Sequence, residues 1–160
     1  MQVNTNANPV LKGAFLVDQL ASDAKTFFMT RTINRLVKSG LNSISVFRRN
    51  ISLNPFSAHF GTFEAKHALY FKSPVIATDI FSAKMLLDST HIGPRYFYVW
   101  DLDWLYKVQN YMDYEQIYSS DLKLISRCDQ HAKLIEQCWK KPTILIEEFN
   151  YDNIATIFAR

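Results

Sequence analysis

The sequence lacks the marks of a membrane-spanning or secreted protein. No apolar run approaches the roughly 20 residues that cross a bilayer, so we expect no membrane span. The first nine residues, MQVNTNANP, contain no basic region followed by an apolar core, so we expect no secretory signal. The two cysteines, Cys128 and Cys138, lie ten apart and share no metal-like spacing with a histidine pair. Free thiols in a reducing cytoplasm are the simplest interpretation, and a cytoplasmic location is the expectation.

Cofactor motifs are also missing. The chain contains neither G-x-G-x-x-G nor a P-loop, so it has no recognisable phosphate-binding motif for a dinucleotide or a nucleoside triphosphate. His59, His67 and His131 do not have the spacing of metal ligands. We therefore expect no resident cofactor and no metal. Internal repeats, low-complexity segments and linkers are absent as well, which indicates one domain.

The sequence does contain ample material for a packed core. Its 160 residues are 48% hydrophobic and 14% aromatic, which suits one ordinary domain and excludes a mainly disordered chain. A net charge of +3 permits an anionic partner without requiring one. We predict a flexible N-terminal arm over residues 1–12 and a single Rossmann-like α/β domain over residues 13–160.

Strand and helix patterns alternate along the chain. Short apolar runs predict strands over residues 13–17, 43–47, 74–79, 96–100, 123–126 and 143–146. Helices are expected between them, with Ser22, Asp129 and Asp152 as N-caps, over residues 62–70 and 82–89, and irregularly within 107–118. Such alternation gives a parallel sheet with helices on both faces. The predicted fold is a Rossmann-like three-layer α/β/α sandwich with a mostly parallel sheet of about six strands.

The segment RYFYVWDLDWLY, residues 95–106, organises the prediction. Its unbroken apolar run predicts a strand buried on both faces, with residues 74–79 and 123–126 as neighbours. Asp101 and Asp103 follow this strand at its carboxyl end, where open α/β sheets bind ligands. Both acids point the same way if the chain stays extended, and they diverge if it turns. The alternative is that either acid only caps the next helix.

The same edge of the sheet supplies the other candidate residues. Polar side chains just after the predicted strands give the substrate-binding candidates Asp18, Ser22, Asp79, Ser82, Trp104, Arg127 and Glu147. His91 is a third catalytic candidate in the loop before the central strand, with a plain surface role as its alternative. The tryptophans could stack on a sugar or a base, or belong to the core. A basic helix face of Arg31, Arg35 and Lys38 could contact nucleic acid, or be solvated.

The chain resembles the N-terminal half of a GT-B glycosyltransferase. Three segments carry the resemblance, namely RYFYVWDLDWLY, SSDLKLISRCDQHAKLIEQCW and PTILIEEFNYDNIATIF. Their order is similar to that of phage DNA glucosyltransferases, so a phage-encoded protein acting in the host cytoplasm is expected. The resemblance implies an acceptor-binding domain in which Asp101 is the general base, oriented by Asp103 or His91.

Two departures from the family pattern bear on this expectation. The turn over residues 18–24 lacks the glycines of many members. The domain that holds the nucleotide sugar would have to come from a second chain or a longer parent protein. Two alternatives therefore remain open, a non-enzymatic module that binds a host protein or forms a homodimer, and a nucleic-acid-binding domain.

Overall fold

The computed structural model describes residues 10–38, 40, 42–90 and 93–159. Strands and helices alternate along this part of the chain, in the order β1 (Lys12–Val17), α1 (Ala24–Val37), β2 (Ser43–Arg48), β3 (Thr62–Glu64), η1 (Ala65–Tyr70), β4 (Val75–Ala77), α2 (Ile80–Asp88), β5 (Arg95–Val99), η2 (Asp103–Leu105), η3 (Val108–Asn110), α3 (Tyr111–Ser119), β6 (Lys123–Ser126), α4 (Asp129–Trp139), β7 (Thr143–Leu145), η4 (Glu147–Phe149) and α5 (Tyr151–Phe158). The elements labelled η are 3-10 helices. Residues 1–9 of the predicted arm lie outside the described residues, and Lys12 at its other end already belongs to β1.

The seven strands form one sheet in the order β3-β2-β1-β4-β5-β6-β7, and every pair in it is parallel. The sequence predicts about six strands, and the additional one is β3 at the edge beside β2. From β1 the chain moves outward in one direction through β2 and β3. It then returns to the other side of β1 and moves outward through β4 to β7. The neighbours β1 and β4 therefore form a topological switch point, where such sheets bind ligands.

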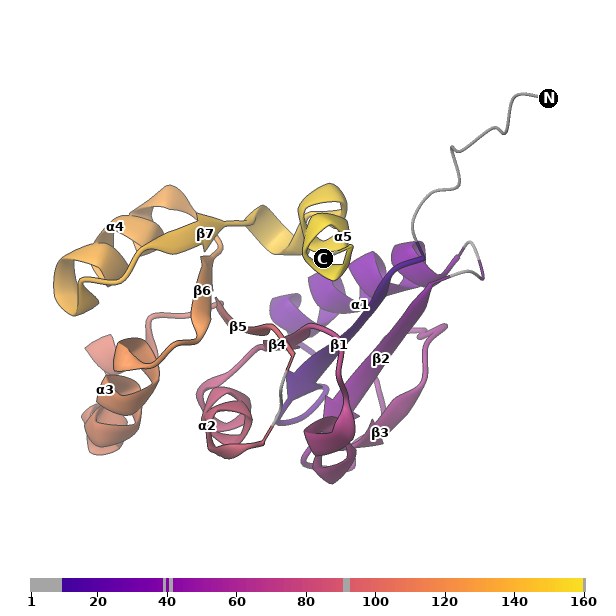
Figure 1. Cartoon of the computed structure of the whole chain (residues 1–160), viewed down its shortest axis with the longest axis horizontal. Coiled ribbons are helices and arrows are strands. Elements are labelled where there is room, and N and C mark those ends of the chain that lie inside the picture. The colour runs from indigo at the N-terminus through magenta and orange to yellow at the C-terminus, as the bar shows by residue number, and fades with distance from the viewer. Residues whose placement is uncertain (1–9, 39, 41, 91–92, 160) are drawn as a thin grey trace.

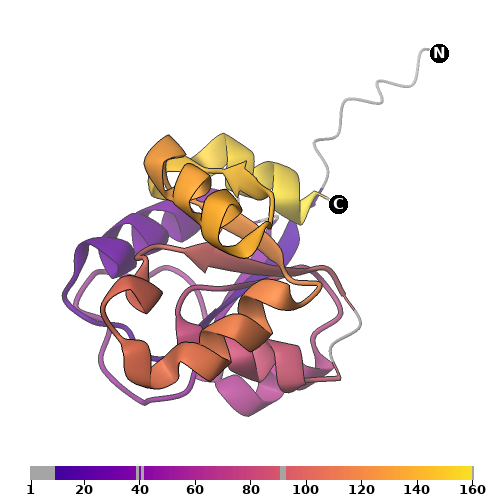
Figure 2. The same cartoon turned by 90° about the vertical axis from the view of Figure 1, so that its left-hand side faces the viewer.

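Helices cover both faces of the sheet, so the predicted three-layer sandwich is confirmed (Figure 1). On one face α1 and α5 bury Ile33 and Ile157 against the strands. On the other face α2, α3 and α4 bury Leu86, Ile117 and Ile135. In Figure 2 the yellow α5 lies on one side of the central strands, and α2 and α3 lie on the other. None of the described helices combines the length and apolar content that crossing a membrane requires.

The central strand β5 is buried on both faces, as predicted. Tyr96 and Tyr98 point into the core beneath α1 and α5, whereas Phe97 and Val99 belong to the opposite core. Its neighbours are β4 and β6, which are the two strands that the sequence places beside it. The predicted centre of the molecule is therefore confirmed.

The predicted helix over residues 62–70 is wrong. Thr62–Glu64 instead forms β3, and Ala65–Tyr70 forms the 3-10 helix η1. Strand β3 is only three residues long and its side chains are half-buried or exposed, so it carries no apolar run that sequence reasoning can detect. Its extended conformation comes from pairing with β2, which is a tertiary interaction.

The predicted N-caps are also misplaced. Asp23, not Ser22, caps α1 by accepting a hydrogen bond from the Thr26 N–H. Helix α4 begins at Asp129 itself. Helix α5 is capped by Asn150, which lies two residues before the predicted Asp152. Each error is one or two residues. At α1 and α5 two cap-forming side chains stand close together, whereas the N-cap of α4 is Cys128, whose side chain makes no cap hydrogen bond.

Helix α5 returns across the sheet to the first strand. The Phe158 ring lies so close to Gly13 that a Cβ atom there would be 2.1 Å from its Cδ1 atom. Phe158 also packs edge-to-face against Phe15, with ring centroids 5.6 Å apart. Gly13 is therefore required for its small size, since any side chain would displace α5 from β1.

Candidate functional site

The carboxyl ends of the strands meet at one edge of the sheet and bring the predicted site residues there. Asp18 follows β1, Asp79 follows β4, Asp101 follows β5, Arg127 follows β6 and Glu147 follows β7. Because all pairs are parallel, these side chains start from the same edge. These residues form separate groups along the edge, because Asp79 and Asp101 line one pocket, Arg127 and Glu147 line another, and Asp18 lines neither.

Hydrogen bonds of Asp79 and Asp18 connect the strand ends at the switch point between β1 and β4. The Asp79 Oδ1 atom accepts the Ser82 N–H at 2.8 Å, and its Oδ2 atom accepts the Asp18 N–H at 2.8 Å. The Asp18 carboxylate accepts hydrogen bonds from Arg49 at 2.6 Å and Asn50 at 3.0 Å. These contacts tie the ends of β1, β2 and β4 together. Both carboxylates therefore have structural partners at the place where the sequence predicts substrate binding.

Ser82, Ser22 and Trp104 are in different surroundings. Ser82 is buried and completes the capping box of α2, since its hydroxyl accepts the Asp79 N–H at 3.1 Å. Ser22 is exposed in the loop before α1. Trp104 packs against Tyr118 and Trp139, with ring centroids 4.9 and 5.9 Å away. Trp104 thus packs against the core, which was the alternative to stacking on a sugar or a base.

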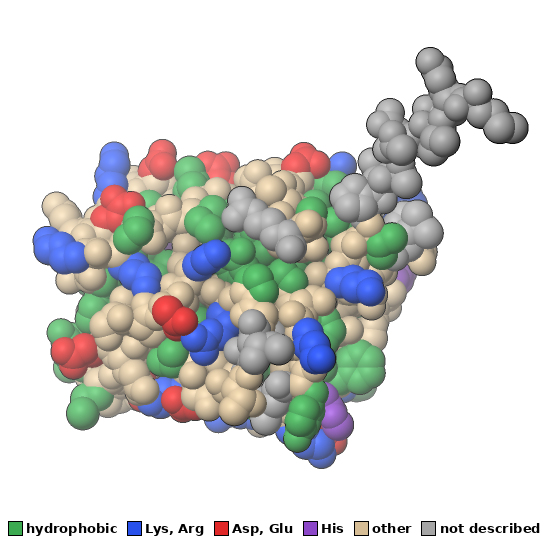
Figure 3. Space-filling view, viewed as in Figure 1, with side chains coloured by type: hydrophobic (Ala, Val, Ile, Leu, Met, Phe, Trp, Pro, Cys, Tyr) green, Lys and Arg blue, Asp and Glu red, His purple; other side chains and the backbone are tan. Residues whose placement is uncertain are grey.

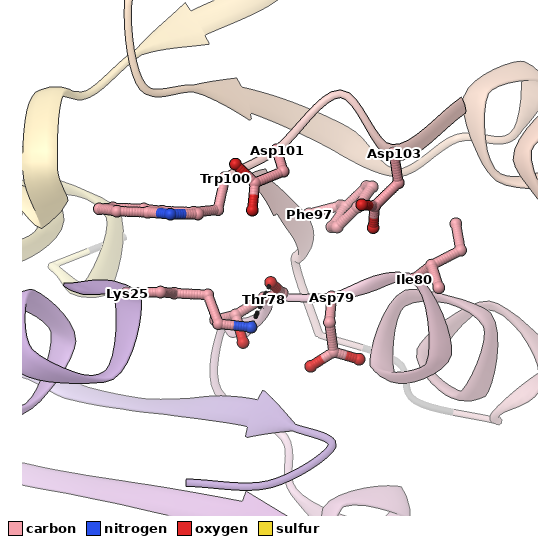
Figure 4. A pocket seen from close by; sticks show the side chains of 8 residues that line it. All are labelled: Lys25, Thr78, Asp79, Ile80, Phe97, Trp100, Asp101 and Asp103. Carbon is pink, nitrogen blue, oxygen red and sulfur yellow. Dashed lines mark hydrogen bonds between the residues drawn. The ribbon is translucent and has the colours of Figure 1, made fainter. Parts of the chain in front are cut away.

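A small pocket opens between α1 and the ends of β4 and β5, and we call it the Asp101 pocket (Figure 4). Its volume is about 50 Å³, enough for one or two water-sized groups. It is lined by Lys25, Thr78, Asp79, Ile80, Phe97, Trp100, Asp101 and Asp103. The Lys25 ammonium donates to the Thr78 carbonyl oxygen at 3.4 Å. The Thr78 hydroxyl is buried and has no hydrogen-bond partner among the described residues.

The two acids after β5 differ in their partners. Asp103 accepts hydrogen bonds at 3.0 Å from both the Tyr106 hydroxyl and the Lys107 ammonium. This ion pair raises the pKa of Lys107. Asp101 is exposed and has no hydrogen bond or ion pair within the described part of the chain. The chain turns after β5, yet both acids line the same pocket.

A larger open pocket lies beside the first, at the ends of β6 and β7. Its volume is about 390 Å³, and we call it the Arg127 pocket. It is lined by Arg31, Arg127, Cys128, Glu147, Glu148 and Asn150. The Arg127 guanidinium lies over the Trp100 ring, 4.7 Å from its centroid, and Trp100 also lines the Asp101 pocket. Trp100 of the Asp101 pocket is therefore in contact with Arg127 of the Arg127 pocket.

The backbone beneath the Arg127 pocket is strained. Glu148 and Phe149 have φ angles of 44° and 55°, which non-glycine residues rarely adopt. Three contacts hold this conformation. The Phe149 N–H donates to the Tyr98 hydroxyl at 3.1 Å, the Phe149 carbonyl accepts from the Thr32 hydroxyl at 2.7 Å, and the Phe149 ring stacks on Tyr98. Strain that a surrounding structure over-determines is found most often at binding and catalytic sites.

Two histidines, His91 and His131, are considered as candidates for the site. His91 lies outside the described residues, so its predicted role stays a prediction. His131, which sequence reasoning set aside, stands in the first turn of α4 with a buried Nδ1 atom that has no partner among the described residues. Burial lowers the pKa of His131 and the charge of Arg127 adds to this effect, while the charge of Asp101 opposes it. Its position just after the carboxyl end of β6 was the signal that could have identified it.

The predicted basic face of α1 is only partly free. The guanidinium groups of Arg31 and Arg35 lie over the rings of Phe28 and Tyr151, 4.9 and 4.2 Å from the centroids. Figure 3 shows lysine and arginine side chains scattered over one face of the molecule without merging into a continuous patch. Nucleic-acid binding by Arg31, Arg35 and Lys38 stays a prediction. In the described part of the chain, no three His, Cys, Asp or Glu side chains are grouped so that they could hold a metal ion.

No protein-family model matches the chain, and no curated protein is significantly similar to it. What the structure shows is a Rossmann-like, all-parallel α/β sheet with two adjoining pockets at its carboxyl edge.

Proposed function

We propose that the chain is the acceptor-binding domain of a GT-B glycosyltransferase and that Asp101 is its general base. The observation that carries the proposal is the difference between Asp101 and three other aspartates that follow β1, β4 and β5 at the same edge. Asp18, Asp79 and Asp103 each accept hydrogen bonds from the protein, whereas Asp101 has none among the described residues. An exposed carboxylate with free lone pairs, next to a pocket at the end of the central strand, is the group best placed to accept a proton from a ligand.

In the proposed reaction an acceptor hydroxyl enters the Asp101 pocket. Its oxygen forms a bond to the anomeric carbon of the sugar, its proton passes to Asp101, and the bond from that carbon to the nucleotide phosphate breaks. The buried Thr78 hydroxyl would hold the entering hydroxyl, and the Lys25 side chain lines the same pocket as the carboxylates. A donor-binding domain closing over this edge would exclude water, the condition under which a carboxylate becomes a stronger base.

The fold supports this proposal without requiring it, because many functions use Rossmann-like sheets. The resemblance of residues 95–106 to the family's acceptor-facing strand places an acid at the position that the structure leaves without a hydrogen-bond partner. A nucleotide sugar as donor, a phage origin and action in the host cytoplasm belong to the same proposal.

The test is sugar transfer by the complete gene product that contains these 160 residues. A panel of nucleotide sugars labelled in the sugar is incubated with acceptor saccharides, and labelled product is counted. Asp101→Asn should lower transfer by about 10²- to 10⁴-fold, the usual range for a lost general base. Asp88→Asn, at the exposed C-terminal end of α2, is the matched control and should leave transfer unchanged. Full activity of Asp101→Asn would refute the assignment.

A second candidate function, a dimerisation module, is favoured by one surface. Five apolar side chains in the segment after the central strand are each more than half exposed, namely Leu105, Tyr106, Val108, Tyr111 and Met112. Exposed apolar side chains gathered in this way are typical of interaction sites. Light scattering should then show a dimer that Met112→Lys converts to a monomer, and a monomeric wild-type protein at high concentration would eliminate this candidate.

A further inference from the structure

We propose that the Arg127 pocket binds a saccharide unit that carries a carboxylate, such as a hexuronic acid, and so selects an acidic acceptor. This inference names the acceptor class of the proposed transferase and rests on that function. The pocket's volume of about 390 Å³ falls in the range of small-ligand sites. Its lining is polar and charged, which suits a carbohydrate rather than an apolar molecule.

The charged side chains of the pocket have no oppositely charged partner in the described part of the chain. Arg31, Arg127, Glu147 and Glu148 line one cavity, and none of them forms an ion pair or a side-chain hydrogen bond in the described part of the chain. Three other arginines do have such partners: Arg48 donates to the Ser52 carbonyl oxygen, Arg49 to Asp18, and Arg95 to both carboxylate oxygens of Asp121 at 2.6 Å. Unpaired groups of both signs around one cavity are the arrangement expected where a ligand completes the interactions.

Aromatic rings position the two guanidinium groups. Arg127 lies 4.7 Å from the centroid of Trp100, and Arg31 lies 4.9 Å from that of Phe28. Contact with a ring occupies the face of a guanidinium and leaves its N–H donors, which lie in the plane, free to bind an anion. Since less side-chain freedom is then lost on binding, these arginines are pre-organised for a bidentate partner.

The backbone that carries the acidic residues of the pocket is also held in place. Glu148 projects from the strained backbone that Tyr98 and Thr32 hold in place beneath the pocket. Glutamate carboxylates accept hydrogen bonds from hydroxyl groups and repel anions. A ligand that fits must therefore place an anion beside the arginines and hydroxyl donors beside the glutamates.

The balance of charge selects a carboxylate over a phosphate. Two arginines and two glutamates give the four charged groups no net charge, so a group with a single negative charge is better accommodated than one with nearly two. Arg127 of this pocket contacts Trp100 of the Asp101 pocket, so we infer that one acceptor spans both pockets. The carboxylate would then anchor the acceptor while a neighbouring hydroxyl meets Asp101.

The experiment measures binding of three probes to the chain by saturation-transfer NMR. The probes are glucuronate, neutral glucose and glucose 6-phosphate. Glucuronate should bind at least tenfold more tightly than either of the others. Arg127→Gln should weaken glucuronate about tenfold, and Glu147→Gln should improve glucose 6-phosphate relative to glucuronate. The control is Arg35→Gln, because Arg35 lies on the same helix as Arg31 and stacks on Tyr151 outside the pocket, and it should change nothing.

Equal binding of glucuronate and glucose, or an equal loss in Arg35→Gln and Arg127→Gln, would overturn the inference. Thermal melts of each variant exclude unfolding as the cause of a loss. The two proposals can fail separately, because Asp101→Asn should lower transfer by about 10²- to 10⁴-fold and still bind glucuronate. Glucuronate binding without any transfer would refute the transferase proposal alone. Transfer to neutral acceptors without a preference for glucuronate would refute this inference alone.

Discussion

The hydroxyl group of Tyr98 is a point at which the stability of the strained loop can be measured. It donates a hydrogen bond to the Ile146 carbonyl and accepts the Phe149 N–H at 3.1 Å, and the residue is fully buried. Tyr98→Phe keeps the ring and its stacking on Phe149, with centroids 4.0 Å apart. The substitution therefore removes the two hydrogen bonds and little else.

The expected cost follows from those two groups. A buried backbone donor or acceptor left without a partner costs about 1–3 kcal/mol. Two such groups give a loss of about 2–6 kcal/mol in the free energy of unfolding. Glu148 and Phe149 hold left-handed φ angles that cost about 1–3 kcal/mol each, and relaxation of the loop recovers part of this. We therefore expect a loss of about 2–3 kcal/mol.

Strand β5 offers a matched control. The Tyr96 hydroxyl is also buried but has no partner among the described residues, so Tyr96→Phe removes no hydrogen bond. Urea unfolding followed by circular dichroism, with linear extrapolation to water, gives both values. Tyr96→Phe should lie within about 0.5 kcal/mol of the wild type or be more stable. Equal losses in the two variants, or an unchanged Tyr98→Phe, would refute the reasoning.

Three further predictions concern other parts of the molecule. Asp79→Ala should lower the free energy of unfolding by about 2 kcal/mol, because it removes a helix cap and the acceptor at the end of β1, whereas Asp101→Ala should stay within about 0.5 kcal/mol in the same urea assay. Gly13→Ala should lower the melting temperature, since overpacking costs about 1–3 kcal/mol, and Phe158→Leu should restore part of it in the double variant. Burial raises the pKa of Tyr98 to about 12, above its unfolded value of about 10, so its contribution to stability is complete below pH 10 and is lost toward pH 12. Unfolding at pH 9 and pH 11.5 should show a smaller decrease in Tyr98→Phe than in the wild type.

The sequence predicts the interior of the sheet well and its edges poorly. Strand β5 and its two neighbours follow from unbroken apolar runs, because a strand buried on both faces must be apolar throughout. Strand β3 does not follow, because its extended conformation depends on pairing with β2 at the edge. Helix starts are predicted to within one or two residues, since Ser22 and Asp23 are equally suitable caps until the backbone selects one.

The candidate site, like the sheet, is predicted only in part. The rule that ligands bind after parallel strands identifies Asp18, Asp79 and Asp101 together, and it cannot rank them. What distinguishes these aspartates is whether the folded chain supplies hydrogen-bond partners. One such contact joins residues 61 apart in the chain, since the Asp18 N–H donates to Asp79. Arg31 as a member of the Arg127 pocket could not be predicted either, because α1 and the end of β6 meet only in the folded molecule.

The return of α5 to β1 affects how the protein can be made. The apolar side chains of β1 and α1, such as Phe15 and Ile33, leave the ribosome early, but residues 149–158 must follow before that core is covered. During translation the nascent chain therefore exposes one face of its sheet until nearly all of these elements have been synthesised. Surface of this kind makes partly folded chains prone to aggregate, and it gives chaperones a site to bind.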